Sequence, residues 1–195
     1  MEQRTPGGQV NPFVISEAIE QVKAGNREAF ATIIRAFEKQ IYTYCYYILR
    51  NREEAEDAVQ EVFVKVYREL RRYEERVSFS AWLYKVAYHH CLDQIRKRKR
   101  RNRLLSLYKE QRPNAYYNLK DDDPFQKLLI DELTAEERNL LILKVVEQYS
   151  FEEMGQIMEC NPATLRKKFE RLRKKLVRQR MIEGGGSHGE VARSN

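Results

Sequence analysis

The sequence lacks any long apolar run. None approaches the roughly 20 residues that a helix needs to cross a membrane. The opening segment, MEQRTPGGQVNPF, also lacks the apolar core of a secretory signal. We therefore expect no stable membrane insertion and a cytoplasmic location.

Cysteine is scarce, with three residues in the whole chain: Cys45, Cys91 and Cys160. The number is odd, the spacing is wide, and no CxxC pair occurs, so the pattern is not that of a disulfide framework. Each cysteine lies in an apolar or amphipathic stretch, which favours a small buried side chain. A reducing compartment fits this usage.

Motifs for metal-dependent or nucleophilic catalysis are also missing. The chain has no HExxH sequence, no glycine-rich phosphate loop and no nucleophile elbow. His89, His90 and Cys91 are adjacent, so a helix cannot direct all three toward one metal ion. We expect a protein that is not an enzyme and that uses no metal ion or cofactor.

The composition has an excess of basic residues over acidic ones. The net charge is +7 and the sequence pI is about 9.3. An acidic partner is therefore expected, with nucleic acid and a membrane surface as the usual candidates. With 195 residues, of which 42% are hydrophobic, the chain has room for one large domain or two small ones.

Apolar residues repeat at intervals of three and four, and no stretch alternates like a half-buried strand. We predict an all-α fold of two small helical domains joined by a flexible linker, the second containing a helix-turn-helix. The first domain covers residues 16–102. Its first helix should begin at an N-cap, Ser16, and end at Gly25. Further helices are expected over residues 26–48, 53–70 and 80–101.

The linker is predicted at residues 103–123, which show no sustained period. The second domain follows at 124–181, and a polar tail at 182–195 should be disordered. The helices of the second domain should start at an Asp123-Pro124 pair, at the capping boxes Thr134–Glu137 and Ser150–Glu153, and at Asn161-Pro162.

A helix-turn-helix is predicted at residues 150–176. Both of its helices have an apolar face, and the break between them is about three residues long, as DNA-binding helix pairs require. Long cationic side chains on the second helix could reach phosphates and base edges, although an ordinary solvated basic face remains the alternative. The expected DNA contacts are Thr164, Arg166, Lys167, Lys168, Arg171, Lys174 and Lys175.

The helix at 79–101 begins with aromatic residues and ends in a run of cations. This combination suits unpaired bases, because aromatic rings stack on any base while cations hold the backbone. Most of the aromatic residues, Trp82 among them, are expected in the core. Phe79, placed in the preceding loop, is the better candidate for touching a base. The expected contacts are Phe79, Tyr88, His89, Arg96, Lys97, Arg98, Lys99 and Arg100.

One further pattern leads to a family. Asp57, Gln60, Glu61 and Phe63 lie within residues 55–67, which resemble the polymerase-binding helix of sigma factors, with its Asp-x-x-Gln-Glu-x-Phe core. The first three share one helix face. The helix at 79–101 resembles the promoter-melting segment of that family, and residues 150–176 resemble its reader of the upstream element. The resemblance covers residues 26–102 and 125–178 and indicates the small extracytoplasmic-function (ECF) group.

The resemblance implies a mechanism. Asp57, Gln60 and Glu61 would bind core RNA polymerase at the clamp coiled coil of its largest subunit. The 79–101 helix would hold the −10 element of promoter DNA, and the last helix would read the −35 element. An anti-sigma factor is also implied. Because polymerase would hold the two readers apart, binding to free DNA should be weak.

Three positions depart from the usual family pattern: Glu75 and Glu159 replace glycines, and His89 replaces an asparagine near the base-reading site. The turn at Glu159 is therefore expected to differ in shape. The alternative function is a conventional helix-turn-helix regulator that acts without docking on polymerase. It would explain residues 150–176 but not the Asp57 pattern.

Overall fold

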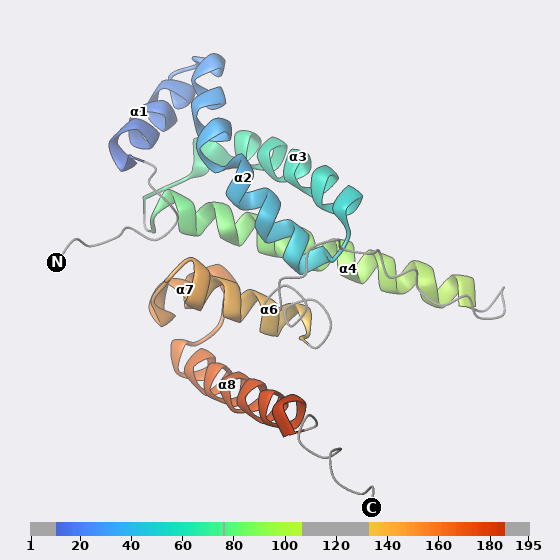
Figure 1. Cartoon of the computed structure of the whole chain (residues 1–195). Coiled ribbons are helices and arrows are strands. Elements are labelled where there is room, and N and C mark those ends of the chain that lie inside the picture. The colour runs from blue at the N-terminus through green and yellow to red at the C-terminus, as the bar shows by residue number, and fades with distance from the viewer. Residues whose placement is uncertain (1–10, 76, 107–132, 186–195) are drawn as a thin grey trace, which may run out of the picture.

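The computed structural model describes residues 11–75, 77–106 and 133–185 (Figure 1). Within these ranges every regular element is a helix, which confirms the predicted all-α class. The longer helices are α1 (Pro12–Lys23), α2 (Phe30–Leu49), α3 (Arg52–Glu69), α4 (Phe79–Ser106), α6 (Ala135–Leu141), α7 (Phe151–Met158) and α8 (Pro162–Gly185). Short helical turns at Arg27–Ala29, Leu70–Arg72 and Ile142–Val146 connect them.

The first helix begins earlier than predicted. Asn11, not Ser16, is the N-cap of α1, because its side-chain oxygen accepts a hydrogen bond from the Phe13 N–H at 3.0 Å. Pro12 then takes the first helical position, where its missing N–H costs nothing. The predicted stop at Gly25 is confirmed: its φ of +103° is one that glycine adopts without strain.

A tight corner joins α2 to α3. Arg50 ends α2 in the left-handed conformation, and Asn51 then caps α3 by accepting from the Glu54 N–H at 2.8 Å. The corner folds the two helices onto each other, and their apolar faces form most of the first domain's core. Fully buried side chains here include Ile33, Ile41, Ile48, Ala55, Val62 and Val66.

The long helix α4 crosses this pair and projects beyond it (Figure 1). It begins at Phe79 and runs to Ser106, so residues 103–106 are helical where a linker was predicted. The rest of the predicted linker, with the Asp123-Pro124 pair, lies outside the described residues. The helix continues because residues 96–103 are mostly Arg and Lys, which favour helix and can remain solvated.

Both predicted capping boxes of the second domain are confirmed. The Thr134 hydroxyl accepts from the Glu137 N–H while the Glu137 carboxylate accepts from the Thr134 N–H, and Ser150 and Glu153 repeat the arrangement. The helix α8 starts at Pro162, as predicted, but runs to Gly185. Residues 182–185 are therefore helical, contrary to the predicted disorder, and 186–195 lie outside the described residues.

The two domains are in contact. Helices α6 and α7 pack against α2 and α4, so that α4 lies between the first domain's other helices and the second domain (Figure 1). The helix α8 packs on α6 and α7 and lies on the side away from α4. The function of α4 therefore has to be judged together with the domain that covers it.

Candidate polymerase and promoter interfaces

The predicted polymerase-binding residues form one exposed face of α3. Asp57, Gln60 and Glu61 are all exposed, while Val62 and Phe63 on the opposite side are buried. The helix backbone is fixed by its packing on α2 and α4, so these polar groups are displayed on a rigid element. An acidic and amide surface of this kind is suited to a basic partner helix.

Two more residues belong to this surface, and the sequence pattern did not single them out. Val64 is 50% exposed and adds an apolar contact one turn beyond Gln60. His90 reaches over from α4 and places its Nε2 3.9 Å from a carboxylate oxygen of Glu61. Burial lowers the pKa of His90, and the Glu61 carboxylate only partly offsets this. The imidazole is therefore mainly neutral at pH 7.

Phe79 was predicted to lie in a loop. In the structure it instead begins α4 and is buried. Its ring packs against Phe37, Tyr73 and Trp82, each with ring centroids 5.6 Å away. The Tyr73 hydroxyl donates to the Val77 carbonyl at 2.8 Å and closes the loop over this cluster. Packing four aromatic rings together stabilises the fold more than leaving one ring exposed to solvent, which explains why Phe79 is buried. A base contact by Phe79 would require this cluster to open.

Tyr88 and His89 lie at the interface with the second domain. Tyr88 is 6% exposed, and burial together with the Glu136 carboxylate raises its pKa to about 12. His89 places its Nε2 3.7 Å from a carboxylate oxygen of Glu159, the residue at the turn between α7 and α8. In this arrangement Tyr88 is closed to a base, whereas the side chain of His89 remains 35% exposed.

The cationic run at the end of α4 divides into two groups. Lys97, Lys99 and Arg100 are exposed and available to DNA phosphates. Arg98 turns inward instead, donating to the Leu49 carbonyl at 3.2 Å and to Glu54 at 2.9 Å. It thereby ties α4 to the corner between α2 and α3. Arg96 pairs with Asp93 on its own helix at 3.0 Å and remains largely exposed.

The helix α8 is anchored by Leu165 and Leu172, which are buried. Most of the predicted DNA contacts are exposed, and Lys168 and Lys175 are half-buried. Three of the cations are already paired within the domain: Arg166 with Glu152, Lys168 with Glu136, and Lys175 with Glu137 at 3.1 Å. Promoter phosphates would have to compete with these carboxylates.

The turn before α8 has the left-handed backbone conformation that the glycine usual at position 159 in the resembled family would adopt. Glu159 has a φ of +51°, so the prediction that this turn would differ in shape is wrong. Gly155 makes the turn possible, although the sequence pattern gave it no role. A Cβ at this position would lie 2.9 Å from the Cys160 carbonyl oxygen. The only feature of the sequence that pointed to this role of Gly155 was the presence of a glycine within a short helix.

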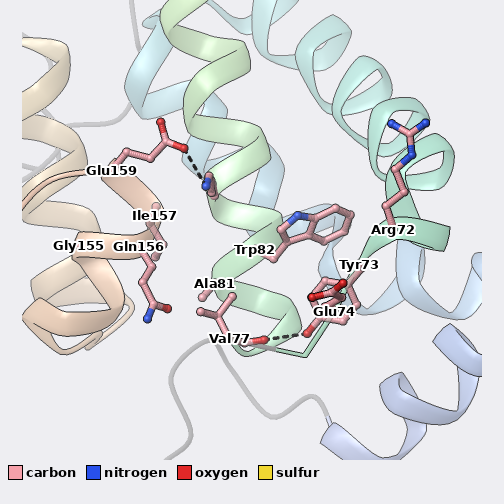
Figure 2. A pocket seen from close by; sticks show the side chains of 11 residues that line it. Arg72, Tyr73, Glu74, Val77, Ala81, Trp82, Gly155, Gln156, Ile157 and Glu159 are labelled. Atoms are coloured by element: carbon pink, nitrogen blue, oxygen red, sulfur yellow. Dashed lines mark hydrogen bonds and ion pairs between the residues drawn. The ribbon is translucent and has the colours of Figure 1, made fainter.

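An interdomain groove of about 650 Å³ lies beside the turn (Figure 2). Tyr73 and Trp82 line it from the first domain, and Gln156, Ile157 and Glu159 line it from the second. Within the described ranges, no three His, Cys, Asp or Glu side chains are placed to share a metal ion. None of the described helices is long and apolar enough to span a membrane.

Two helical domains, one with an exposed acid-and-amide face and one with a helix-turn-helix, define a DNA-binding protein that also docks on a protein partner. Residues 33–101 match sigma-70 region 2, and residues 127–176 match sigma-70, region 4. The chain is 30% identical over 182 residues to the ECF RNA polymerase sigma factor SigW of Bacillus subtilis strain 168. That alignment covers 86% of this chain and 97% of the relative.

A second relative is the RNA polymerase sigma-H factor of Pseudomonas aeruginosa, 26% identical over 171 residues, with 80% of this chain and 89% of the relative covered. The chain belongs to the sigma-70 family, in its ECF group. It is therefore a sigma factor that binds polymerase and directs promoter recognition, and a helix-turn-helix regulator of another kind is not favoured.

Two solved structures share the fold. The sigma factor RpoE of Bartonella quintana, in complex with the anti-sigma factor NepR, has a TM-score of 0.64 at 23% identity and covers 79% of this chain and 96% of its own. CnrH, in complex with the cytosolic domain of CnrY, has a TM-score of 0.63 at 17% identity and covers 91% and 100%. Both likenesses extend over the two domains together.

Proposed function

We propose that Asp57, Gln60 and Glu61 are the residues by which this sigma factor binds the clamp coiled coil of the largest polymerase subunit. What supports the assignment is their joint exposure on a helix whose other side is buried. Charged side chains displayed in this way steer association and set specificity for a basic partner. Val64 extends the same surface with an apolar contact.

The −10 element is assigned to α4. Lys97, Lys99 and Arg100 are free to hold the phosphate backbone, which requires only exposed cations. Tyr88 and His89 are assigned to the unpaired bases, because their rings lie about two to three turns before those cations on the same helix. In the structure the Tyr88 ring is buried against the second domain, so its contact with a base requires that domain to move, whereas His89 faces Glu159 and is 35% exposed.

The −35 element is assigned to α8, with Thr164, Arg166, Lys167 and Arg171 at its exposed N-terminal half. In a helix-turn-helix these positions face the major groove. Lys168, Lys174 and Lys175 would contact the flanking phosphates. We further propose an anti-sigma partner and a cytoplasmic location. RpoE and CnrH were each solved with a partner, in RpoE's case an anti-sigma factor, which supports the first proposal.

A pair of substitutions tests the −35 assignment. Lys167→Ala and Arg171→Ala should each lower transcription from a cognate promoter by about tenfold, which corresponds to a lost contact of about 1.4 kcal/mol. Their affinity for core polymerase should not change, because neither residue lies on α3. Lys39→Ala, an exposed cation of α2, is the matched control and should leave transcription unchanged. Loss of polymerase binding in either α8 variant would contradict the assignment.

A further inference from the structure

The helix α7 begins with an aromatic ring that is held from several sides. Phe151 follows the cap residue Ser150, which forms a capping box with Glu153. Its half-buried ring packs edge-on against Phe169 of α8 at a centroid distance of 5.9 Å. The Lys144 ammonium lies 4.9 Å from the centroid of the Phe151 ring. The ring is therefore fixed in place between the two helices of the helix-turn-helix.

Arg166 of α8 extends over this ring and is also paired with a carboxylate. Its guanidinium carbon lies 5.5 Å from the Phe151 centroid, and its Nη2 donates to the Glu152 side chain. An exposed ion pair alone holds a long side chain weakly. Here a cation–π contact acts on the same guanidinium, and both partners come from the first turn of α7. Together the two contacts set the direction in which Arg166 points.

The position of Arg166 on α8 suits contact with a base. It lies near the start of the helix, which begins at Pro162, and this part of the second helix contacts base edges in a helix-turn-helix. Leu165 beside it is buried and anchors this turn of α8. A guanidinium is a planar fork of several N–H donors, and the Arg166 side chain is still 52% exposed when it is paired with Glu152. Donors therefore remain for DNA.

Guanine is the base that such a fork fits. In the major groove it presents two acceptors, O6 and N7, which a guanidinium can meet with two parallel hydrogen bonds. Lys168 and Lys175 are also paired with carboxylates, but an ammonium is a compact charge with no plane to orient. A fork that is restrained before DNA arrives loses less conformational entropy on binding.

We propose that Phe151 and Glu152 are positioning residues for base recognition, which hold the Arg166 guanidinium in the orientation that a guanine of the −35 element requires. The proposal rests on the assignment of α8 to that element. It gives Glu152 a different role from Glu136, whose carboxylate competes with DNA phosphates for Lys168. Loss of the Glu136 carboxylate strengthens binding to any sequence, whereas loss of the Glu152 carboxylate lowers selectivity at one base pair.

Transcription by core polymerase with the full-length chain tests the proposal, on a promoter library randomised in the −35 element whose transcripts are sequenced. The wild type should enrich a G·C pair at one position. Arg166→Ala should lower this enrichment at least about fivefold, because a bidentate contact is lost, and should change the other positions little. Glu152→Ala should lower the enrichment about threefold at the same position, because the Arg166 side chain must then be ordered on binding.

Matched variants separate positioning from charge and from packing. Glu136→Ala makes the same charge change at another exposed carboxylate and should keep the enrichment at that position. Phe151→Tyr retains the ring and should also keep the enrichment, whereas Phe151→Leu should lower it as Glu152→Ala does. Glu152 is 63% exposed, so its substitution should leave the melting temperature near the wild-type value.

Equal effects of Glu152→Ala and Glu136→Ala at every position would show that Glu152 only neutralises charge, and would overturn the positioning role. A guanine preference that persists in Arg166→Ala would overturn the proposal while leaving α8 assigned to the −35 element through Lys167 and Arg171. No base preference in the wild type would contradict that assignment, and the proposal with it. The two failures can therefore be told apart.

Discussion

At the residue scale, neighbouring cations of α4 have different structural roles. Arg98 is bonded to the Leu49 carbonyl and to Glu54, whereas Lys97 and Lys99 are exposed. Arg98→Ala should lower the free energy of unfolding by about 1 kcal/mol, because it removes partly buried charge-assisted hydrogen bonds. Urea denaturation followed by circular dichroism measures this. Lys97→Ala and Lys99→Ala are the controls and should shift it by less than about 0.5 kcal/mol.

The polymerase-binding face makes a second prediction at this scale. Asp57→Arg and Glu61→Arg should each weaken binding to core polymerase by at least tenfold, because a like charge would then face the basic partner. Both side chains are exposed, so the circular dichroism spectrum and the melting temperature should stay near the wild-type values. Glu38→Arg makes the same reversal on an exposed position of α2. Equal weakening in that control would point to a general charge effect.

The exposed residues of α3 could be predicted from the sequence, because a face three and four residues apart needs only helix geometry. The burial of Phe79 could not. Its partners Phe37 and Tyr73 come from α2 and from the loop before α4, so the cluster depends on tertiary packing. The burial of Tyr88 depends likewise on a domain far along the chain.

At the element scale, the helix-turn-helix depends on a close approach at Gly155. Gly155→Ala should destabilise the fold by about 1–3 kcal/mol, because the new methyl group would lie 2.9 Å from the Cys160 carbonyl oxygen. Alanine favours helix over glycine, so helix propensity alone predicts the opposite sign. Thermal melting of the variant decides between them. Gln156→Ala, at the next and exposed position, should change stability little.

At the same scale, three cations of α8 are paired with carboxylates of α6 and α7. Glu136→Gln should release Lys168 and strengthen binding to duplex −35 DNA by about two- to fivefold at low salt. The gain should shrink as salt is raised, because screening weakens both the ion pair and the phosphate contact. Titrations by fluorescence anisotropy at two salt concentrations would show it. Glu38→Gln, which changes the net charge equally, should leave binding nearly unchanged.

The helix starts of the second domain were the most predictable features. The capping boxes at Thr134 and Ser150 and the cap before α8 lie where the sequence places them, since side-chain capping is a local interaction. Helix ends were less predictable. The helix α4 passes into the expected linker because its cations are good helix formers, and no glycine or proline stops it near Arg101.

At the scale of the whole molecule, the two domains form one packed unit in the described structure. The sequence divides them into two units, and residues in each match one family model, sigma-70 region 2 and sigma-70, region 4. The contact between them rests on pairs such as Tyr44 with Asn139, which are 95 residues apart. Local patterns contain no signal for such a pair.

The most direct test of the account is run-off transcription with purified bacterial core polymerase on a library of promoter fragments, with and without this protein. We predict discrete new start sites that disappear with Asp57→Arg and Glu61→Arg and persist with Glu38→Arg. Start sites that persist in the α3 variants would contradict the assigned polymerase interface. No new transcripts, together with no co-elution with core polymerase, would contradict the account as a whole.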